Sequence, residues 1–420
     1  MPPTKAESTA LLDKPVGSTS WWRPLEPSLV VATANLLAAV WQETFYTYVD
    51  EYDIVPIRDD GALRAIVACL FIAGVMLLFS ASLSVGQQHQ PKTTTVLQVL
   101  NGWMLKSVVD SILSSAEIGC AASLSTGGVA SGPALVLSCI AASVAIALLW
   151  TAAAAGATAL LPEEAPSAAC SPRNFGLYMA RLLTGSTFLP TGYAWNEVKE
   201  LVAQALHAAW SREGWSDGAL LVRIVLTHLV LTSLLLVLLA VLKHRTHRWL
   251  RLRADEEGLG GYRARLLRGS IALADKTYVY LIAWSLWAVV EALWGGQPGN
   301  ATCFAPAERW NGLYLSSSAM VALVLLIALA FTALNVVAAA SPSCANPRCL
   351  ATTELGALAW GIVLGSLAPQ LGWAWKEFVT AVSDYATLLV VWRVTTFASI
   401  GLLVANAAVA WVRLCRGWWV

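Results

Sequence analysis

Long apolar segments separated by short polar ones make up most of the chain. A membrane-spanning helix needs about 20 mostly apolar residues. Ten segments meet this length: Leu29–Val49, Leu63–Val85, Val96–Cys120, Ala134–Leu161, Gly176–Trp210, Leu220–Leu242, Ile271–Trp294, Leu313–Ala339, Gly356–Val382 and Leu388–Val412. The pattern predicts an all-α membrane protein with about ten transmembrane helices, although the fifth, ninth and tenth segments also carry charges.

The composition places most of the protein surface against lipid. The chain is 57% hydrophobic and 13% charged, whereas soluble proteins have roughly 45–50% apolar and about 25% charged residues. Its 20 tryptophans suit the membrane interface, where the ring is buried and its N–H stays hydrated. The net charge of +1 gives no electrostatic ground for a nucleic-acid partner. The expected partner is the lipid bilayer of a plasma membrane or endomembrane.

Basic residues divide unequally between the two sides that ten spans define. The opposite side from the termini holds Arg58, Arg64, Arg212 and Arg309. The side with both termini holds Lys5, Lys14, Arg23, Lys92, Arg173, Lys243, Arg245, Arg248, Arg251, Arg253, Arg263, Arg265, Arg268, Arg348, Arg413 and Arg416. Because basic loops stay in the cytosol, we expect cytosolic tails at 1–28 and 413–420. Asn300, in an Asn-Ala-Thr glycosylation acceptor, then lies on the non-cytosolic side.

Similar residues recur about 180 positions apart. Trp103 and Asp110 of the third span match Trp284 and Glu291 of the seventh at an offset of 181, and the run 192–197 matches the run 372–377 at 180. A unit of four spans keeps its orientation when repeated. We therefore expect parallel repeats at 29–161 (spans 1–4) and 176–339 (spans 5–8), with a half unit at 356–412 (spans 9–10).

Ionisable residues gather in the predicted outer half of several spans. Trp-x-Glu triplets end at Glu43, Glu197 and Glu377, and the following spans return Arg64, Arg223 and Arg393 at similar depth. An ionised side chain in a membrane costs about 2.5–3.5 kcal/mol on insertion scales, so it usually finds a partner or water. We expect the pairs Glu43–Arg64, Glu197–Arg223 and Glu377–Arg393. The same layer contains Lys106, Asp110, Lys199, Glu200, His228, Glu291 and Lys376.

This layer has two interpretations. It is either a polar vestibule open to the non-cytosolic side, or an aromatic belt whose charges reach the lipid headgroups. The belt interpretation best suits Lys199 with Glu200 and Lys376 with Glu377. Helix-interrupting residues precede two triplets, at Gly185, Pro190, Gly192, Gly365, Pro369 and Gly372. Such interruptions point to a transport site or to ordinary proline kinks.

The remaining sequence signals are weaker, and they exclude classes of function more than they identify one. The basic stretch within 243–268 predicts a cytosolic loop, with contact to anionic lipid as the functional alternative. The cysteines lack metal-ligand spacing, and Cys120 and Cys303 lie near the outer face as a candidate disulfide. The chain has no phosphate-binding loop, His-Glu-x-x-His or nucleophile elbow. We expect no metal and no cofactor.

The leading hypothesis is a transporter or channel for a small solute or ion. Ten spans, a repeat and paired intramembrane charges favour it. The alternatives are a membrane structural or interaction protein without transport activity, and an intramembrane lipid-modifying enzyme. A cavity that opens sideways to lipid would favour the enzyme, and charges confined to the headgroup plane would favour the structural protein.

Overall fold

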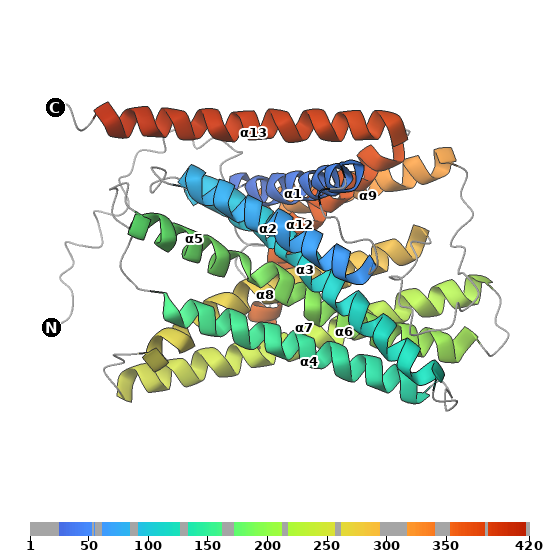
Figure 1. Ribbon diagram of the computed structural model, residues 1–420. Helices are drawn as coiled ribbons and strands as arrows, with labels where there is room; N and C mark the ends of the chain where they lie inside the picture. The colour runs from blue at the N-terminus through green and yellow to red at the C-terminus, as the bar shows by residue number, and fades with distance from the viewer. Residues whose placement is uncertain are drawn as a thin grey trace.

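The computed structural model describes residues 25–52, 54, 61–84, 91–126, 133–161, 172–211, 217–256, 262–294, 317–340, 353–382 and 385–416. Regular structure in these ranges is exclusively α-helical (Figure 1). The helices are α1 (Glu26–Glu51), α2 (Gly61–Ser84), α3 (Pro91–Thr126), α4 (Pro133–Leu160), α5 (Pro172–Ser186), α6 (Phe188–Ser211), α7 (Asp217–Glu256), α8 (Tyr262–Trp294), α9 (Ser317–Ala340), α12 (Glu354–Val382) and α13 (Tyr385–Arg416).

Helices occupy every segment that the apolar pattern predicts, which confirms the all-α expectation. The fifth segment differs in detail, because it divides into α5 and α6 at Thr187. Six helices of the described chain are long and apolar enough to cross a membrane: α2, α4, α7, α9, α12 and α13. The protein is therefore a polytopic integral membrane protein.

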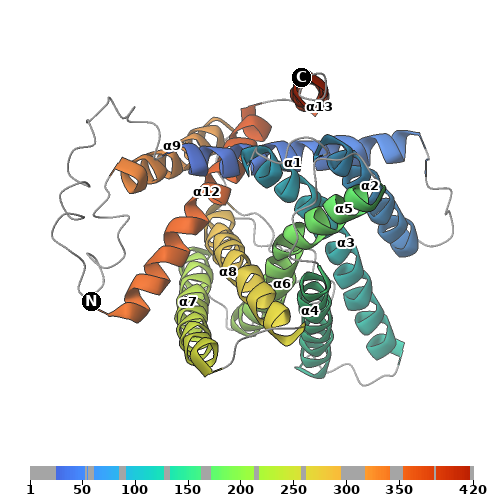
Figure 2. The same ribbon diagram turned by 90° about the vertical axis from the view of Figure 1, so that its left-hand side faces the viewer.

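Five helices form a closed inner ring. α1, α3, α6, α8 and α12 each pack against the next in this order, and α12 returns to α1. The other long helices lie outside: α2 packs on α3, α4 on α6 and α8, α7 on α8, α9 on α12, and α13 on α1. Each outer helix thus contacts the ring helix that follows it in the chain. The last outer helix, α13, contacts the first ring helix, α1, instead. α13 lies along one edge of the molecule (Figures 1 and 2).

Polarity explains which helices lie inside. Carboxylates in the predicted outer half of the spans, such as Asp110, Glu197 and Glu291, lie on ring helices. Large apolar side chains such as Leu149 of α4, Leu234 of α7 and Leu326 of α9 are exposed on the outer helices. Only 17% of the span window of α9 is buried, against 50% for α12. Lipid tails are as apolar as leucine, so exposure of these side chains costs nothing in a membrane. Charges are costly there, and the ring removes them from lipid.

Small residues allow neighbouring ring helices to approach closely. A Cβ added to Gly192 of α6 would lie 3.2 Å from the carbonyl oxygen of Thr277 on α8. One added to Gly372 of α12 would collide with the carbonyl oxygen of Ala32 on α1. Membrane helices pack mainly through such close van der Waals contact. These two glycines therefore set two of the five crossings in the ring.

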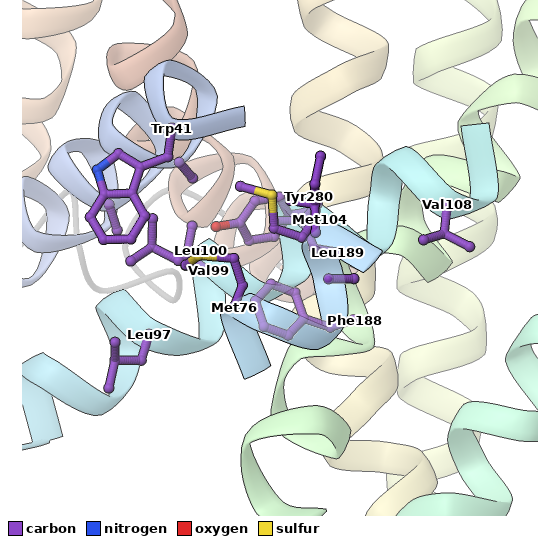
Figure 3. Close-up of a cluster of buried hydrophobic side chains, with 14 of the residues drawn as sticks. Trp41, Met76, Leu97, Val99, Leu100, Met104, Val108, Phe188, Leu189 and Tyr280 are labelled. Carbon is purple, nitrogen blue, oxygen red and sulfur yellow. The ribbon is translucent and has the colours of Figure 1, made fainter. Parts of the chain in front are cut away.

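The largest apolar cluster joins α1, α2, α3, α6, α8 and α12. Figure 3 shows part of it, including Met76 of α2, Met104 of α3, and Phe188 and Leu189 of α6. Leu189 is fully buried. A Cβ added to Gly102 of α3 would lie 3.0 Å from the Cβ of Leu189. The cluster continues into the middle of the ring through Tyr280 of α8. This packing fixes the polar side chains that lie farther along the same helices.

Candidate functional site

Aromatic rings fill the middle of the inner ring. Trp284 of α8 stacks on Trp373 of α12 with 5.6 Å between ring centroids, and Trp373 meets Trp103 of α3 edge-on at 6.3 Å. α3 and α12 are not neighbours in the ring, so this contact spans its interior. Tyr193 of α6 meets Trp284 at 5.5 Å. We call Trp103, Tyr193, Trp284 and Trp373 the aromatic stack.

A buried asparagine ties this stack to α1. Trp103 Nε1 donates a 3.0 Å hydrogen bond to Asn35 Oδ1. Asn35 Nδ2 donates to Val31 O at 2.8 Å and to the Tyr280 hydroxyl at 3.0 Å. Asn35 has no exposed surface, and its bonds reach both the adjacent α3 and the non-adjacent α8. The network therefore holds three ring helices together at the level of the stack.

Carboxylates lie farther along the same five helices. Asp110 and Glu291 each follow a stack tryptophan by seven residues, which is two helical turns or about 10 Å. Glu197 interacts electrostatically with Asp110 and Glu200, and Glu291 does so with Glu200 and Glu377. We call the full set the carboxylate layer: Glu43, Asp110, Glu197, Glu200, Glu291 and Glu377. All five ring helices contribute to it.

Asp110 lies where α3 meets α6. Lys106 Nζ donates to Asp110 Oδ2 at 2.9 Å, and the Tyr193 hydroxyl donates to Asp110 Oδ1 at 2.8 Å. The Lys106 ammonium also lies 4.0 Å from the centroid of the Tyr193 ring. The Asp110 side chain is nevertheless 41% exposed. This carboxylate is thus held in place and still accessible.

A second charged group is deeply buried between α6 and α7. Lys199 Nζ is 2.6 Å from Glu200 Oε1, and His228 Nδ1 is 3.9 Å from Glu200 Oε2. The side chains of Lys199, Glu200 and His228 are 8%, 12% and 2% exposed. Headgroup contact requires exposure, so the belt interpretation is wrong for Lys199 and Glu200. α7 covers this side of α6 and shields the pair from lipid.

The structure changes the partners expected for two glutamates and an arginine. Arg393 of α13 binds Glu51 at 2.6 Å rather than Glu377. Glu377 lies 3.7 Å and Glu43 lies 3.8 Å from Lys376 Nζ. Lys376 therefore bridges α12 to α1, which sequence spacing alone does not reveal. Within the described residues, Arg64 and Arg223 are not among the ion-pair partners of Glu43 and Glu197.

The glycine and proline positions differ between the two halves. The helix breaks at Thr187, before Pro190, whereas α12 continues through Pro369. Side chains bind the nearby backbone: Thr187 Oγ1 donates to Thr184 O at 2.7 Å, and Asn335 Nδ2 of α9 donates to Leu367 O at 3.1 Å. Gly185 packs against Gln98 and Gly365 against Val279. The glycines at these positions allow close helix packing.

A pocket of about 380 Å³ with a mixed polar and apolar lining lies among α1, α2 and α3. α1 and α2 scarcely touch, while both pack along α3, so α3 forms its floor. Its lining includes Tyr46, Arg64, Cys69, Ser107, Asp110 and Ser111. The Tyr46 hydroxyl donates to Cys69 Sγ at 2.7 Å, and Cys69 Sγ is 3.2 Å from Ser111 Oγ. The pocket thus adjoins the carboxylate layer at Asp110.

The basic stretch 243–268 is mostly helical rather than a loop. α7 continues to Glu256 and α8 begins at Tyr262. Lys243 forms a 3.0 Å ion pair with Asp275 of α8, and His244 lies 3.7 Å from Glu354 of α12. Part of its positive charge is therefore used inside the protein. The glycosylation candidate Asn300 and the tail 1–24 lie outside the described residues.

Sequence reasoning missed Asn35, Tyr193 and Tyr280 as interior residues. Asn35 had a usable signal, because a lone amide in an apolar stretch must find hydrogen bonds inside the membrane. The sequence gives no such signal for the two tyrosines, because a tyrosine ring suits the membrane interface as well as the protein interior. Comparison of the chain with family models, curated proteins and solved structures finds no match.

Proposed function

We propose that this protein transports a small solute or ion, with the ring interior as its pathway. The carrying observation is that all five ring helices contribute carboxylates at a similar level, and that these groups interact from one ring helix to the next. A protein that only packs in the membrane gains nothing from bringing so many costly charges together. Intramembrane ionisable groups that face a bundle interior are typical of solute and ion pathways.

The charge balance of the interior favours certain solutes. Six carboxylates of the layer face three lysines, Lys106, Lys199 and Lys376. A site lined by an excess of one sign attracts the opposite sign and repels its own. Cations and solutes that contain an ammonium group are therefore favoured over anions. The layer is the vestibule of this proposal, and it opens toward the non-cytosolic side.

The aromatic stack would close the pathway on the cytosolic side of the vestibule. Contacts across the ring, such as Trp103–Trp373, leave the rings in van der Waals contact. Trp373 Nε1 is buried and lacks a hydrogen-bond partner among the described residues. Such an unsatisfied donor costs about 1–3 kcal/mol, and a second conformation that satisfies it would recover that cost. A stack that rearranges suits a carrier better than a permanently open channel.

The orientation remains that expected from the basic residues, with both termini in the cytosol. One disulfide supports it. Cys139, near the start of α4, is disulfide-bonded. The start of α4 faces the non-cytosolic side in this topology, where disulfides persist. In this topology the other non-cytosolic cysteines besides the free Cys69 are Cys120 and Cys303, so a bond from Cys139 to either of them replaces the expected pair Cys120–Cys303.

We also propose that the two halves of the chain are parallel structural repeats. Trp195 Nε1 of α6 donates to Thr151 Oγ1 of α4, and Trp375 Nε1 of α12 donates to Thr332 Oγ1 of α9. These bonds join corresponding residues in the two halves. Trp41 Nε1 of α1 makes a similar bond to Ser399 Oγ of α13. α13 thus bonds to a tryptophan of α1, as α4 does to one of α6 and α9 to one of α12.

A flux assay in liposomes tests transport through the stack. We expect Trp373→Ala to raise cation flux at least tenfold over the intact protein, because it removes the ring that contacts Trp103, Trp284 and Trp287. Trp375→Ala is the matched control, since it removes an equal ring from the same helix beside α9. Equal flux from the two variants, or none from either, contradicts a pathway through the ring and favours the structural alternative.

A further inference from the structure

The pocket among α1, α2 and α3 contains groups of both charges. Arg64 enters from α2 and Asp110 from α3, and both line the same 380 Å³. This volume lies within the roughly 300–1,000 Å³ of small-molecule sites. Hydroxyls from Tyr46, Ser107 and Ser111 line the remaining polar wall. The pocket therefore offers a cationic hydrogen-bond donor, an anionic acceptor and neutral hydroxyl groups.

Asp110 can accept a ligand without losing its present contacts. An ionised carboxylate has about four lone-pair sites, and Lys106 and Tyr193 each use one. The side chain remains 41% exposed. Arg64 offers a planar fork of N–H donors that suits a carboxylate or phosphate. Its charge discourages a purely cationic ligand, and Asp110 discourages a purely anionic one.

We infer that this pocket binds a small zwitterion, with a primary ammonium group on Asp110 and an anionic oxygen group on Arg64. The inference rests on the proposed transport function and names its substrate class. Two sources share this chemistry, a free amino acid and an ethanolamine phospholipid headgroup. A headgroup would have to enter between α1 and α2, which scarcely touch each other.

The first measurement is binding of radiolabelled alanine to the full-length protein in phosphatidylcholine nanodiscs. Propionate and ethylamine are the competitors that each lack one charge, and we expect neither to displace alanine at equal concentration. Charged hydrogen bonds contribute enough that losing one weakens binding about tenfold to a hundredfold. We expect this loss in Arg64→Gln and in Asp110→Asn. Arg223→Gln, a loss of the same charge from α7, should bind normally.

Cys69 reports where the ligand binds. This cysteine lines the pocket as a free but buried thiol, 3% exposed, so a reagent must enter the pocket to reach it. Its alkylation by a small maleimide, read by peptide mass spectrometry on the intact protein, should slow when alanine is present. This readout uses the unmodified chain, so it holds even if a charge variant fails to fold. Unchanged alkylation under saturating alanine places the ligand elsewhere and overturns the proposal.

The lipid source is tested by replacing phosphatidylcholine with phosphatidylethanolamine in the nanodiscs. Slower Cys69 alkylation in that lipid without added alanine assigns the pocket to the headgroup. Protection by alanine alone assigns it to the free amino acid. Protection by neither probe overturns the zwitterion site. Flux measured on the same protein reconstituted in liposomes separates the two proposals: binding without flux contradicts transport, whereas flux without binding contradicts only this pocket.

Discussion

Gly372 offers the sharpest test of the ring, because the structure gives its substitution a defined collision. In Gly372→Ala the new methyl group would overlap the carbonyl oxygen of Ala32 and lie 3.2 Å from the Asn35 Cβ. The first obstacle is backbone, so it cannot rotate away as a side chain can. α1 and α12 must separate, which displaces Asn35 and its bonds to Trp103 and Tyr280.

The size of the effect follows from overpacking. One extra methyl group in a tightly packed core typically costs 1–3 kcal/mol, and we expect a loss of about 2 kcal/mol or more here. Gly361→Ala is the matched control in the same helix, because nothing lies within 4 Å of its added Cβ. Alanine is the better helix former by about 1 kcal/mol in exposed helices, so this control should be neutral or stabilising.

The assay is reversible unfolding in detergent, followed by tryptophan fluorescence and by circular dichroism. The stack tryptophans should report the displaced crossing in Gly372→Ala even before unfolding. Equal stabilities for Gly372→Ala and Gly361→Ala would falsify the close α1–α12 approach, and with it the closed ring.

Three further outcomes are expected. In a double-mutant cycle on the buried pair, Lys199→Met or Glu200→Gln alone should cost about 3–5 kcal/mol of stability, and the double variant much less; additive losses would show that the charges act independently. Thr151→Val and Thr332→Val should destabilise to a similar extent, about 1 kcal/mol each for a lost hydrogen bond, and clearly unequal losses would count against the repeat. Tags on both termini should be reached by antibody only in permeabilised cells, and labelling of intact cells would contradict the topology.

The sequence predicted the helices and the burial of charge, and it did so from length and composition. Apolar runs of about 20 residues have few alternatives in a bilayer, because backbone groups must be satisfied within the segment. It also located the ionisable residues of the carboxylate layer by their depth in each span. It failed on partners, as Arg393 with Glu51 shows. Depth alone does not say which helices are neighbours.

The break in the fifth segment and the unbroken α12 mark a similar limit. Both segments contain a proline between two glycines. Only the surroundings distinguish them, since Asn335 of α9 binds the α12 backbone near Pro369, whereas threonine hydroxyls bind the backbone around Thr187. A local pattern predicts where a helix is weak, and neighbouring side chains decide whether it breaks.

What the sequence by itself determined is the relation of each segment to lipid, since the cost of exposing a charge or an unpaired amide depends on residue type alone. Only the tertiary structure decided which segments close the ring, which tryptophans meet at its centre and that Arg64 and Asp110 share a pocket. These features depend on helix crossings set by single atoms, such as the missing Cβ of Gly372 against Ala32. Such contacts join residues hundreds of positions apart, and no periodicity along the chain records them.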